Sequence, residues 1–324
     1  MKRLISLLLC ALLIVPALAE DAPDFEPIPW DIKVSPNLPN PDCYLPNNGG
    51  YHDDSIDIQI NVTYWTQDLQ QVDAPGEGTT TVMSARVKLT DVSQFRTGFA
   101  NKYPSKQARH VNDMTKRFNA VMGIDGDYCL YHEQGIVVRN GQTLRIRPHK
   151  GRDELIVDEN GDFHLITCTT QAKWDEYIAG GGTVLHAFCF GPALVVDGVP
   201  LTSLDDVTID NGKAKKAQRM VIGQIGKLEY LILTNEGPES TAPKSVGFDL
   251  VQMANLCVQF GLNNAYNLDG GSSSTIALNN QKINSPSSHK NRMVGDCIWF
   301  ATLVKEETWR EKESVQTVEV EENK

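Results

Sequence analysis

The segment Asn267-Leu268-Asp269-Gly270-Gly271-Ser272-Ser273-Ser274-Thr275 is the most informative stretch of this sequence. It follows Asn264-Ala265-Tyr266, which reads as the start of a buried strand, so the polar residues come where that strand ends. Two glycines let the backbone approach a ligand closely, and successive amides in a tight turn form a site for an anion. Asp269 cannot attract an anion, and it therefore indicates catalysis or metal binding. The alternative is a plain turn, because Asp-Gly-Gly is an ordinary hairpin signal.

A helix is expected directly before this segment, over residues 249–260. Asp249 stands at the N-cap position and Gln252 follows three residues later, which is the pattern of a capping box. Gly261 comes where the helix should end, because glycine accepts the left-handed backbone conformation found after many helices. The motif around Asp269 is therefore the last part of a helix–strand–loop unit.

Elsewhere the pattern is mostly that of short strands separated by turn pairs such as Asn140-Gly141 and Asp197-Gly198. From Ser55 onward Ile56, Ile58, Ile60 and Val62 alternate with polar residues, as in a half-buried strand. Further strands are expected at residues 81–88, 136–139, 143–147, 154–157 and 163–167, and further helices at 105–120 and 173–178. The predicted class is α+β, with a mainly antiparallel sheet and several packed helices in one catalytic domain at residues 51–304.

The two ends of the chain read differently from this domain. Residues 1–19 have the charge, apolar run and Ala17-Leu18-Ala19 site of a secretory signal, which predicts a secreted or cell-envelope protein. Residues 20–50 hold seven of the 16 prolines and are expected to form an extended, weakly structured lead-in. Residues 305–324 form a charged tail.

Composition excludes several classes of function. The net charge is −11, and removal of Lys2 and Arg3 with the signal would make it −13, which argues against nucleic-acid binding. No segment after the signal is long and apolar enough to span a membrane. Six cysteines remain in the mature chain, an even number that permits disulfides of undetermined pairing. The motifs of serine hydrolases, zinc proteases, nucleotide triphosphatases and dehydrogenases are missing.

Asp125 and Asp127 are a second pair of candidate residues, in Ile124-Asp125-Gly126-Asp127 after a probable strand. Carboxylates two residues apart on a strand face the same side, so these two can serve as acid and base or can bind Ca²⁺ or Mg²⁺ together with Asp269. The alternative is a solvated turn. His186 lies between apolar residues and is expected to belong to the core.

Four segments in this order resemble the phosphodiester glycosidase family over about residues 80–304. They are Val121 to Cys129, Phe190 to Gly198, Gln218 to Gln224, and the unit from Ser245-Val246-Gly247 to Thr275; Asn291-Arg292-Met293-Val294 is similar to the family's ending. The chain differs from the family pattern at Asp125, where Asn is usual, at Cys129, where a nearby Phe is usual, at Gln252, where Glu is frequent, and at Ser272, where Gly is common.

The resemblance implies hydrolysis of a sugar 1-phosphodiester, with an N-acetylglucosamine-like sugar in a glycan or an envelope polymer. It implies that Asp269 is the catalytic carboxylate, that Arg219 binds the phosphate, and that neighbouring residues hold phosphate or sugar. For Arg219 the alternative is a structural arginine on a strand face. The expected substrate-binding residues are Gly270, Gly271, Ser272, Ser273, Ser274 and Asn267, and the expected catalytic residues are Asp269, Asp125, Asp127 and Arg219. No cofactor is certain, and Ca²⁺ or Mg²⁺ is the candidate.

Two other functions stay open at this point. One is a non-catalytic carbohydrate- or phosphate-binding envelope protein that keeps the same scaffold. The other is an enzyme that transfers the sugar to an acceptor during exopolysaccharide assembly. The sugar, the group across the phosphate, the stereochemical outcome and the oligomeric state are not determined by the sequence.

Overall fold

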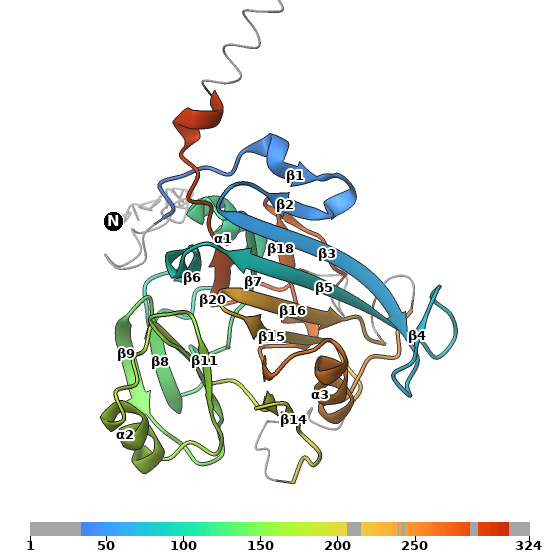
Figure 1. The fold of residues 1–324 in the computed structure, drawn as a ribbon. Helices are drawn as coiled ribbons and strands as arrows, with labels where there is room; N and C mark the ends of the chain where they lie inside the picture. Colours follow the sequence, from blue (N-terminus) through green and yellow to red (C-terminus); the bar gives the residue numbers. More distant parts are fainter. Residues whose placement is uncertain (1–33, 206–214, 239, 241–243, 286–290, 311–324) are drawn as a thin grey trace, which may run out of the picture.

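The computed structural model describes residues 34–205, 215–238, 240, 244–285 and 291–310 (Figure 1). The expected signal, residues 1–19, lies outside the described residues, as does most of the charged tail. Strand pairs in the described part of the chain are antiparallel and form three sheets. The prediction of a mainly antiparallel fold is therefore confirmed.

The longest sheet has ten strands in the order β1-β2-β3-β5-β16-β15-β17-β13-β14, with β4 paired to β3. Its members are β1 (Tyr44–Leu45), β2 (Gly50–His52), β3 (Ile56–Trp65), β4 (Gln71–Val72), β5 (Thr80–Leu89), β13 (Ala193–Val196), β14 (Val199–Pro200), β15 (Arg219–Gly226), β16 (Glu229–Asn235) and β17 (Asn264–Asn267). The Asp269 segment leaves β17, which is the third strand from one end of this order.

A second sheet has five strands in the order β19-β18-β7-β20-β6. They are β6 (Phe95–Phe99), β7 (Met122–Asp125), β18 (Ile276–Leu278), β19 (Gln281–Lys282) and β20 (Asp296–Phe300). The third sheet, β11-β10-β12-β8-β9, consists of β8 (Gly135–Arg139), β9 (Gln142–Arg147), β10 (Glu154–Val157), β11 (Phe163–Ile166) and β12 (His186–Phe188). Figure 1 shows this third sheet to one side of the other two.

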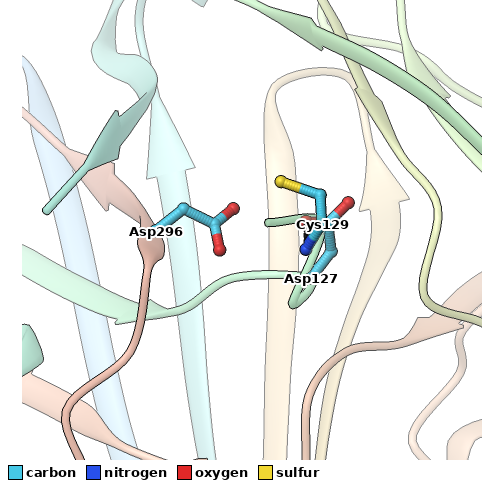
Figure 2. A group of neighbouring side chains, drawn as sticks. All are labelled: Asp127, Cys129 and Asp296. Carbon is cyan, nitrogen blue, oxygen red and sulfur yellow. Dashed lines mark hydrogen bonds between the residues drawn. The ribbon is translucent and has the colours of Figure 1, made fainter. Parts of the chain in front are cut away.

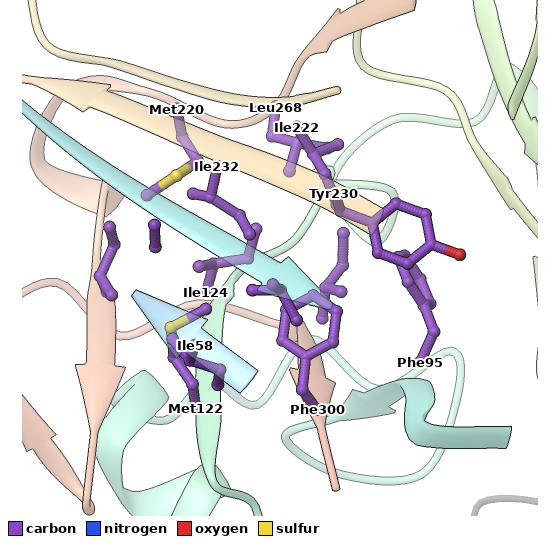
Figure 3. Close-up of a cluster of buried hydrophobic side chains, with 14 of the residues drawn as sticks. Ile58, Phe95, Met122, Ile124, Met220, Ile222, Tyr230, Ile232, Leu268 and Phe300 are labelled. Atoms are coloured by element: carbon purple, nitrogen blue, oxygen red, sulfur yellow. The ribbon is translucent and has the colours of Figure 1, made fainter. Parts of the chain in front are cut away.

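The main core lies between the long sheet and the second sheet (Figure 3). Met220, Ile222 and Ile232 come from the long sheet and are fully buried, and they meet Ile124 and Phe300 of the second sheet. Apolar residues two apart on one strand share a face, which is why alternation in the sequence forms this layer. Val62, expected to follow that alternation, is 47% exposed because β3 runs on toward β4, away from the second sheet.

Helices are fewer and shorter than expected. The described residues contain three α-helices, α1 (Val111–Phe118), α2 (Gln171–Ala179) and α3 (Leu250–Gln259), together with short 3₁₀ turns η1 (Pro41–Cys43), η2 (Pro46–Asn48), η3 (Val92–Gln94) and η4 (Gly271–Ser273). The expectation of several packed helices is thus overstated. The segment 105–110 is not helical, because the backbone N–H and C=O of Arg109 pair with Val294.

The capping box before α3 is confirmed. The carboxylate of Asp249 accepts from the N–H of Gln252 at 2.8 Å, and the Gln252 side chain accepts from the N–H of Asp249 at 3.2 Å. Gly261 follows with a positive φ of 78°, a conformation that favours glycine. Local signals therefore determined this helix correctly.

The end of the expected lead-in joins the fold. Tyr44 and Leu45 pair with β2, and the side chains of Cys43 and Tyr44 pack against the main core. In the described residues no helix has the length and apolar character needed to cross a membrane.

Candidate active site

Several strands bring polar residues to one edge of the main core. β7 ends at Asp125, β20 begins at Asp296, and β18 begins directly after Thr275. In the long sheet, β17 ends just before the Asp269 segment and β16 ends just before Glu236. Since neighbouring antiparallel strands alternate direction, these starts and ends fall on the same side of the molecule.

Asp269 is held in place by the backbone around it. Its N–H donates to the carbonyl of Gly126 at 3.1 Å, and its carboxylate accepts from the N–H of Gly270 at 2.9 Å. The residue is 8% exposed. Burial raises the pKa of Asp269, while the Ser273 hydroxyl and the charge of Arg292 oppose that rise. Asp269 therefore combines a nearly buried carboxylate with a nearby cation.

Two glycines allow the following loop to lie against β15. A Cβ on Gly270 would stand 3.0 Å from the carbonyl oxygen of Gln218, and Gly271 has a φ of 61°. The Gly271 N–H donates to that same carbonyl at 3.0 Å. Both glycines are thus required by the close approach and by the backbone conformation.

The amides of this loop are used within the protein. Ser273 and Ser274 donate their N–H groups to the carbonyls of Gly270 and Gly271, and Thr275 donates its N–H to Asp125 at 2.8 Å. The expected backbone anion nest is therefore mostly occupied. What the loop offers a ligand is its side-chain hydroxyls.

Asp125 lies against this loop and is fully buried. Its Oδ1 accepts from Thr275, whereas its Oδ2, the Ser274 hydroxyl and the Thr275 hydroxyl have no hydrogen-bond partner among the described residues. Burial raises the pKa of Asp125 well above its usual value, and the charge of Asp269 adds to the rise. Buried polar atoms are normally paired, so this group of atoms indicates a place for water or a ligand.

Asp127, expected to act beside Asp125, belongs to a different cluster. Arg139 donates to Asp127 at 2.8 Å and to Asp296 at 3.0 Å, and all three side chains are buried. The amides of Cys129 and Cys189 donate to the two oxygens of Asp127. Figure 2 shows Asp296 facing Asp127 and Cys129. The guanidinium of Arg139 forms an ion pair with each of the two carboxylates.

The charges of this cluster compensate one another. Burial alone would raise the pKa of Asp127, but the positive charge of Arg139 holds it below its usual value. Burial and the charge of Asp127 raise the pKa of Asp296 to about 7. Gly126 lies between the two clusters, donates its N–H to the Asp296 carbonyl at 3.1 Å, and accepts from Asp269. The Arg139 cluster therefore positions the backbone that holds Asp125 and Asp269.

This arrangement limits how a metal ion could bind. Within the described residues, one group of three acidic or thiol side chains has its ligand atoms within 4.8 Å of one another, and it consists of Asp127, Cys129 and Asp296. Arg139 already supplies the cation there, and Ca²⁺ and Mg²⁺ prefer oxygen ligands to a thiol. Because Asp127 is paired with Arg139, it is not available as a third ligand for an ion held by Asp125 and Asp269. A metal requirement therefore stays a prediction.

Arg219, expected to bind phosphate, lies at the entry to α3. Its guanidinium donates to the carbonyl oxygens of Lys215 at 2.6 Å and Phe248 at 3.4 Å. Burial lowers its pKa to about 10, and the nearby charge of Asp249 opposes this. The cation whose charge acts on Asp269 is instead Arg292, whose guanidinium lies 5.8 Å from the ring centre of Tyr128.

Asn267 joins the loop to another predicted segment. Its side-chain amide donates to the carbonyl of Gly191 at 2.8 Å, and its N–H donates to that of Pro192. Its Oδ1 is buried and has no partner among the described residues. Ser272 is partly exposed, and Ser273 is buried beside Asp269.

Glu236 is a residue that the sequence analysis missed. It follows β16 and accepts from the N–H of Ser285 at 2.9 Å, and its Oε2 has no described partner. Burial raises its pKa to about 7. β15 separates β16 from β17, so Glu236 lies about 10 Å from the Asp269 strand, or two strand spacings. A carboxylate directly after a buried strand was the available signal.

The remaining candidates have structural roles. His186 is fully buried, contacts Thr97 and Phe95, and has a pKa that burial lowers to about 3, as expected of a core residue. Asp197 forms the hairpin turn between β13 and β14. The six cysteines 43, 129, 168, 189, 257 and 297 are unpaired thiols, so the disulfides that their even number permitted are not formed here.

Comparison with known proteins identifies the class. The structure is similar to the catalytic domain of zebrafish N-acetylglucosamine-1-phosphodiester alpha-N-acetylglucosaminidase, with a TM-score of 0.60 at 14% identity over 78% of this chain and 86% of that chain. A protein from Synechocystis is similar with a TM-score of 0.49 at 13% identity over 76% of this chain and 62% of that chain. The similarity to the zebrafish domain shows a shared fold.

The family follows from the sequence itself. The model of the phosphodiester glycosidase family matches residues 118–301, which is more than half of the chain and contains both carboxylate clusters. This chain therefore belongs to the phosphodiester glycosidase family. No curated protein matches it.

Proposed function

We propose that this protein is an exported hydrolase that cleaves the sugar–oxygen bond of a glycosyl 1-phosphodiester. The observation that carries the proposal is the group of unpartnered buried polar atoms at Asp125, Ser274 and Thr275, placed beside Asp269. Membership of the phosphodiester glycosidase family supports the reaction class. An N-acetylglucosamine-like sugar in a glycan or an envelope polymer is the proposed substrate.

Asp269 is the proposed ionised carboxylate. The bond between the anomeric carbon and the phosphate oxygen breaks, the phosphate leaves with the bonding electrons, and water supplies the new oxygen on the sugar. Positive charge develops on the sugar ring, and a carboxylate beside it stabilises that charge or orients the water. Burial raises the pKa of Asp269, but Asp269 suits this role because it keeps some contact with solvent and the charge of Arg292 opposes that rise.

Asp125 is proposed to act as a neutral carboxylic acid. Two like charges in one buried site favour protonation of one partner, and Asp125 is the more deeply buried. A protonated carboxyl offers one acceptor and one O–H donor, which is close to what an asparagine amide offers. Asp125 can therefore replace the Asn usual in this family, accepting from Thr275 and donating from Oδ2.

The leaving phosphate requires a cation and hydrogen-bond donors. Arg292 is exposed near Asp269, and the hydroxyls of Ser274 and Thr275 are two of the loop groups without described partners. Because a phosphate monoester leaves readily, donors of this kind can suffice without strong general-acid help.

The test is release of N-acetylglucosamine by residues 20–324 from UDP-N-acetylglucosamine and from an alkyl phosphodiester of the same sugar. Asp269→Asn is expected to lower kcat by about 10²–10⁴-fold with its melting temperature retained. Asp197→Asn, at an exposed turn, is the matched control. Runs with EDTA, Ca²⁺ or Mg²⁺ test the metal requirement.

The outcomes separate the alternatives. Product that forms only with an added acceptor sugar would indicate a transferase. Binding without turnover in either protein, over a panel of phosphate-linked sugars, would indicate a non-catalytic binding protein and contradict the proposal.

A further inference from the structure

A cavity of about 570 Å³ lies next to the candidate active site but does not include its carboxylates. Its walls come from residues 103–106, from residues 129–133 and from β9. Pockets that hold small ligands typically have about 300–1,000 Å³. The size is therefore appropriate for a bound molecule.

The charge of this cavity is opposite to that of the chain. Lys106, Arg145 and Arg147 line it, with His132, whereas Glu133 is the one acidic residue among its lining residues. The whole chain has a net charge of −11. A concentration of cations in a concave site on an acidic protein favours an anionic ligand.

Arg145 supplies a fixed positive charge. Its guanidinium donates to the carbonyl oxygens of Cys129 at 2.9 Å, His132 at 2.7 Å and Gln134 at 2.7 Å. These bonds hold the loop that forms one wall of the cavity. Lys106 and Arg147 are exposed and form no ion pair with a described carboxylate, so their charges remain available to a ligand.

The cavity also has aromatic walls that connect it to the active site. Tyr103 and Tyr131 line it, and the ring of Tyr131 stacks on that of Tyr128 with a centroid distance of 4.5 Å. Arg292 lies over the second ring of this pair, with its guanidinium 5.8 Å from the ring centre of Tyr128. The charge of Arg292 also acts on Asp269. The tyrosine pair therefore separates the cavity from the proposed phosphate position.

We propose that this cavity binds an acidic saccharide, as the part of the substrate that lies across the phosphate from the sugar that is cleaved. Tyr103 and Tyr131 offer faces to a sugar ring, and Lys106 and Arg147 offer charge-assisted hydrogen bonds to its carboxylate or phosphate groups. This assignment rests on the proposed function for the position of the bound saccharide, but the site itself can be tested without turnover.

The experiment measures binding by calorimetry to the protein spanning residues 20–324 and carrying Asp269→Asn. The probes are trigalacturonic acid, which carries carboxylates, glucose 6-phosphate, which carries a phosphate, and neutral maltotriose. We expect the acidic probes to bind and maltotriose to bind at least about tenfold more weakly. Whichever acidic probe binds more tightly identifies the anionic group.

Two double variants locate the site. Lys106→Ala with Arg147→Ala is expected to weaken binding of the acidic probe about tenfold or more, because two charge-assisted contacts are lost. Lys88→Ala with Lys227→Ala removes the same charge from an exposed part of the long sheet and should leave binding within about twofold.

Equal weakening by both double variants, or equal binding of maltotriose, would overturn the proposal. Binding at the cavity in a protein that hydrolyses no phosphodiester would leave the site in place and reject the proposed function. Conversely, the proposed function would stand and the cavity site would be rejected if the protein hydrolyses the phosphodiester but Lys106→Ala with Arg147→Ala binds the acidic probe as tightly as the parent protein.

Discussion

Asp125 and Asp127 are separated by one glycine, yet they lie in opposite kinds of surroundings. Both oxygens of Asp127 accept hydrogen bonds, and Arg139 neutralises its charge. Asp125 has one oxygen without a described partner, near two hydroxyls in the same state and near the charge of Asp269. The carboxylate of Asp127 is thus paired and neutralised, whereas the unpaired oxygen of Asp125 is where a ligand would gain the most from a new hydrogen bond.

Gly126 makes this separation possible. A Cβ at this position would lie 2.4 Å from the Asp296 carboxylate, so a side chain there would displace the partner of Arg139. Its carbonyl and amide meanwhile connect Asp269 to Asp296. The carboxylates of the candidate active site therefore depend on the buried ion cluster for their position.

The largest effect is expected from Arg139→Met. This change leaves two buried carboxylates without their cation and should lower the free energy of unfolding by about 3–5 kcal/mol. Arg139→Lys, which keeps the charge but not the planar fork, should cost less. Urea unfolding followed by tryptophan fluorescence measures both.

The control for that experiment is Arg86→Met. Arg86 pairs with Glu229 on the surface, where its side chain is 50% exposed, so its loss should cost less than about 1 kcal/mol. If the two methionine variants lost the same stability, the buried cluster would not hold the fold as described.

A smaller effect is expected from Glu236→Gln. Like Asp125, Glu236 has one carboxylate oxygen that is buried and has no described partner. The folded pKa of Glu236 is about 7, above the usual value of 4.5, so ionisation disfavours the folded state. The wild type should lose about 1–3 kcal/mol of stability relative to the variant as the pH rises from 4.5 to 8. Melting temperatures across this range measure the difference.

Glu77→Gln, at an exposed position, is the control and should follow the wild type at every pH. A difference between wild type and Glu236→Gln that stayed constant with pH would show that the Glu236 carboxyl does not titrate in this way.

The smallest change is expected from Asp125→Asn, which introduces the residue usual in the family. If Asp125 acts as a neutral acid, kcat/KM near neutral pH should stay within about tenfold of the wild type. Burial and the charge of Asp269 raise the pKa of Asp125 well above its usual value, so activity and stability should fall as the pH rises through that pKa, and the variant should lack this fall. A pH profile of kcat/KM measures it.

Loss of activity at every pH would contradict the neutral-acid role and show that the carboxyl itself is required. A further comparison with Asp269→Asn, whose kcat is expected to be about 10²–10⁴-fold lower at every pH, distinguishes the two carboxyls of the site.

Local signals in the sequence predicted much of this fold. The capping box predicted α3, the alternating residues predicted β3, and the isolated apolar runs predicted β8, β10 and β11 within one or two residues. The helix expected at 105–120 was wrong over its first six residues, because pairing with Val294, far along the chain, took the place of helical hydrogen bonds there. Propensity could not reveal that partner.

In the candidate site, too, local signals predicted one part, and contacts between distant segments decided the rest. Asp269, its two glycines and its hydroxyl residues are one continuous segment whose composition indicates a functional loop by itself. The partners of that loop come from far away, since Asp125 and Thr275 are 150 residues apart and Arg139 and Asp296 are 157 residues apart. Phosphate binding by Arg219 stays a prediction, and two hydrogen bonds of its guanidinium go to the carbonyl oxygens of Lys215 and Phe248.

The sequence by itself therefore determined the family, the antiparallel class and the Asp269 loop, because these depend on residue order and on contacts between near neighbours. Only the tertiary structure decided which carboxylate is neutralised and which remains available. That choice depends on burial and on charges that strand pairing brings together, and a change of one strand register would reverse which side chains face each other.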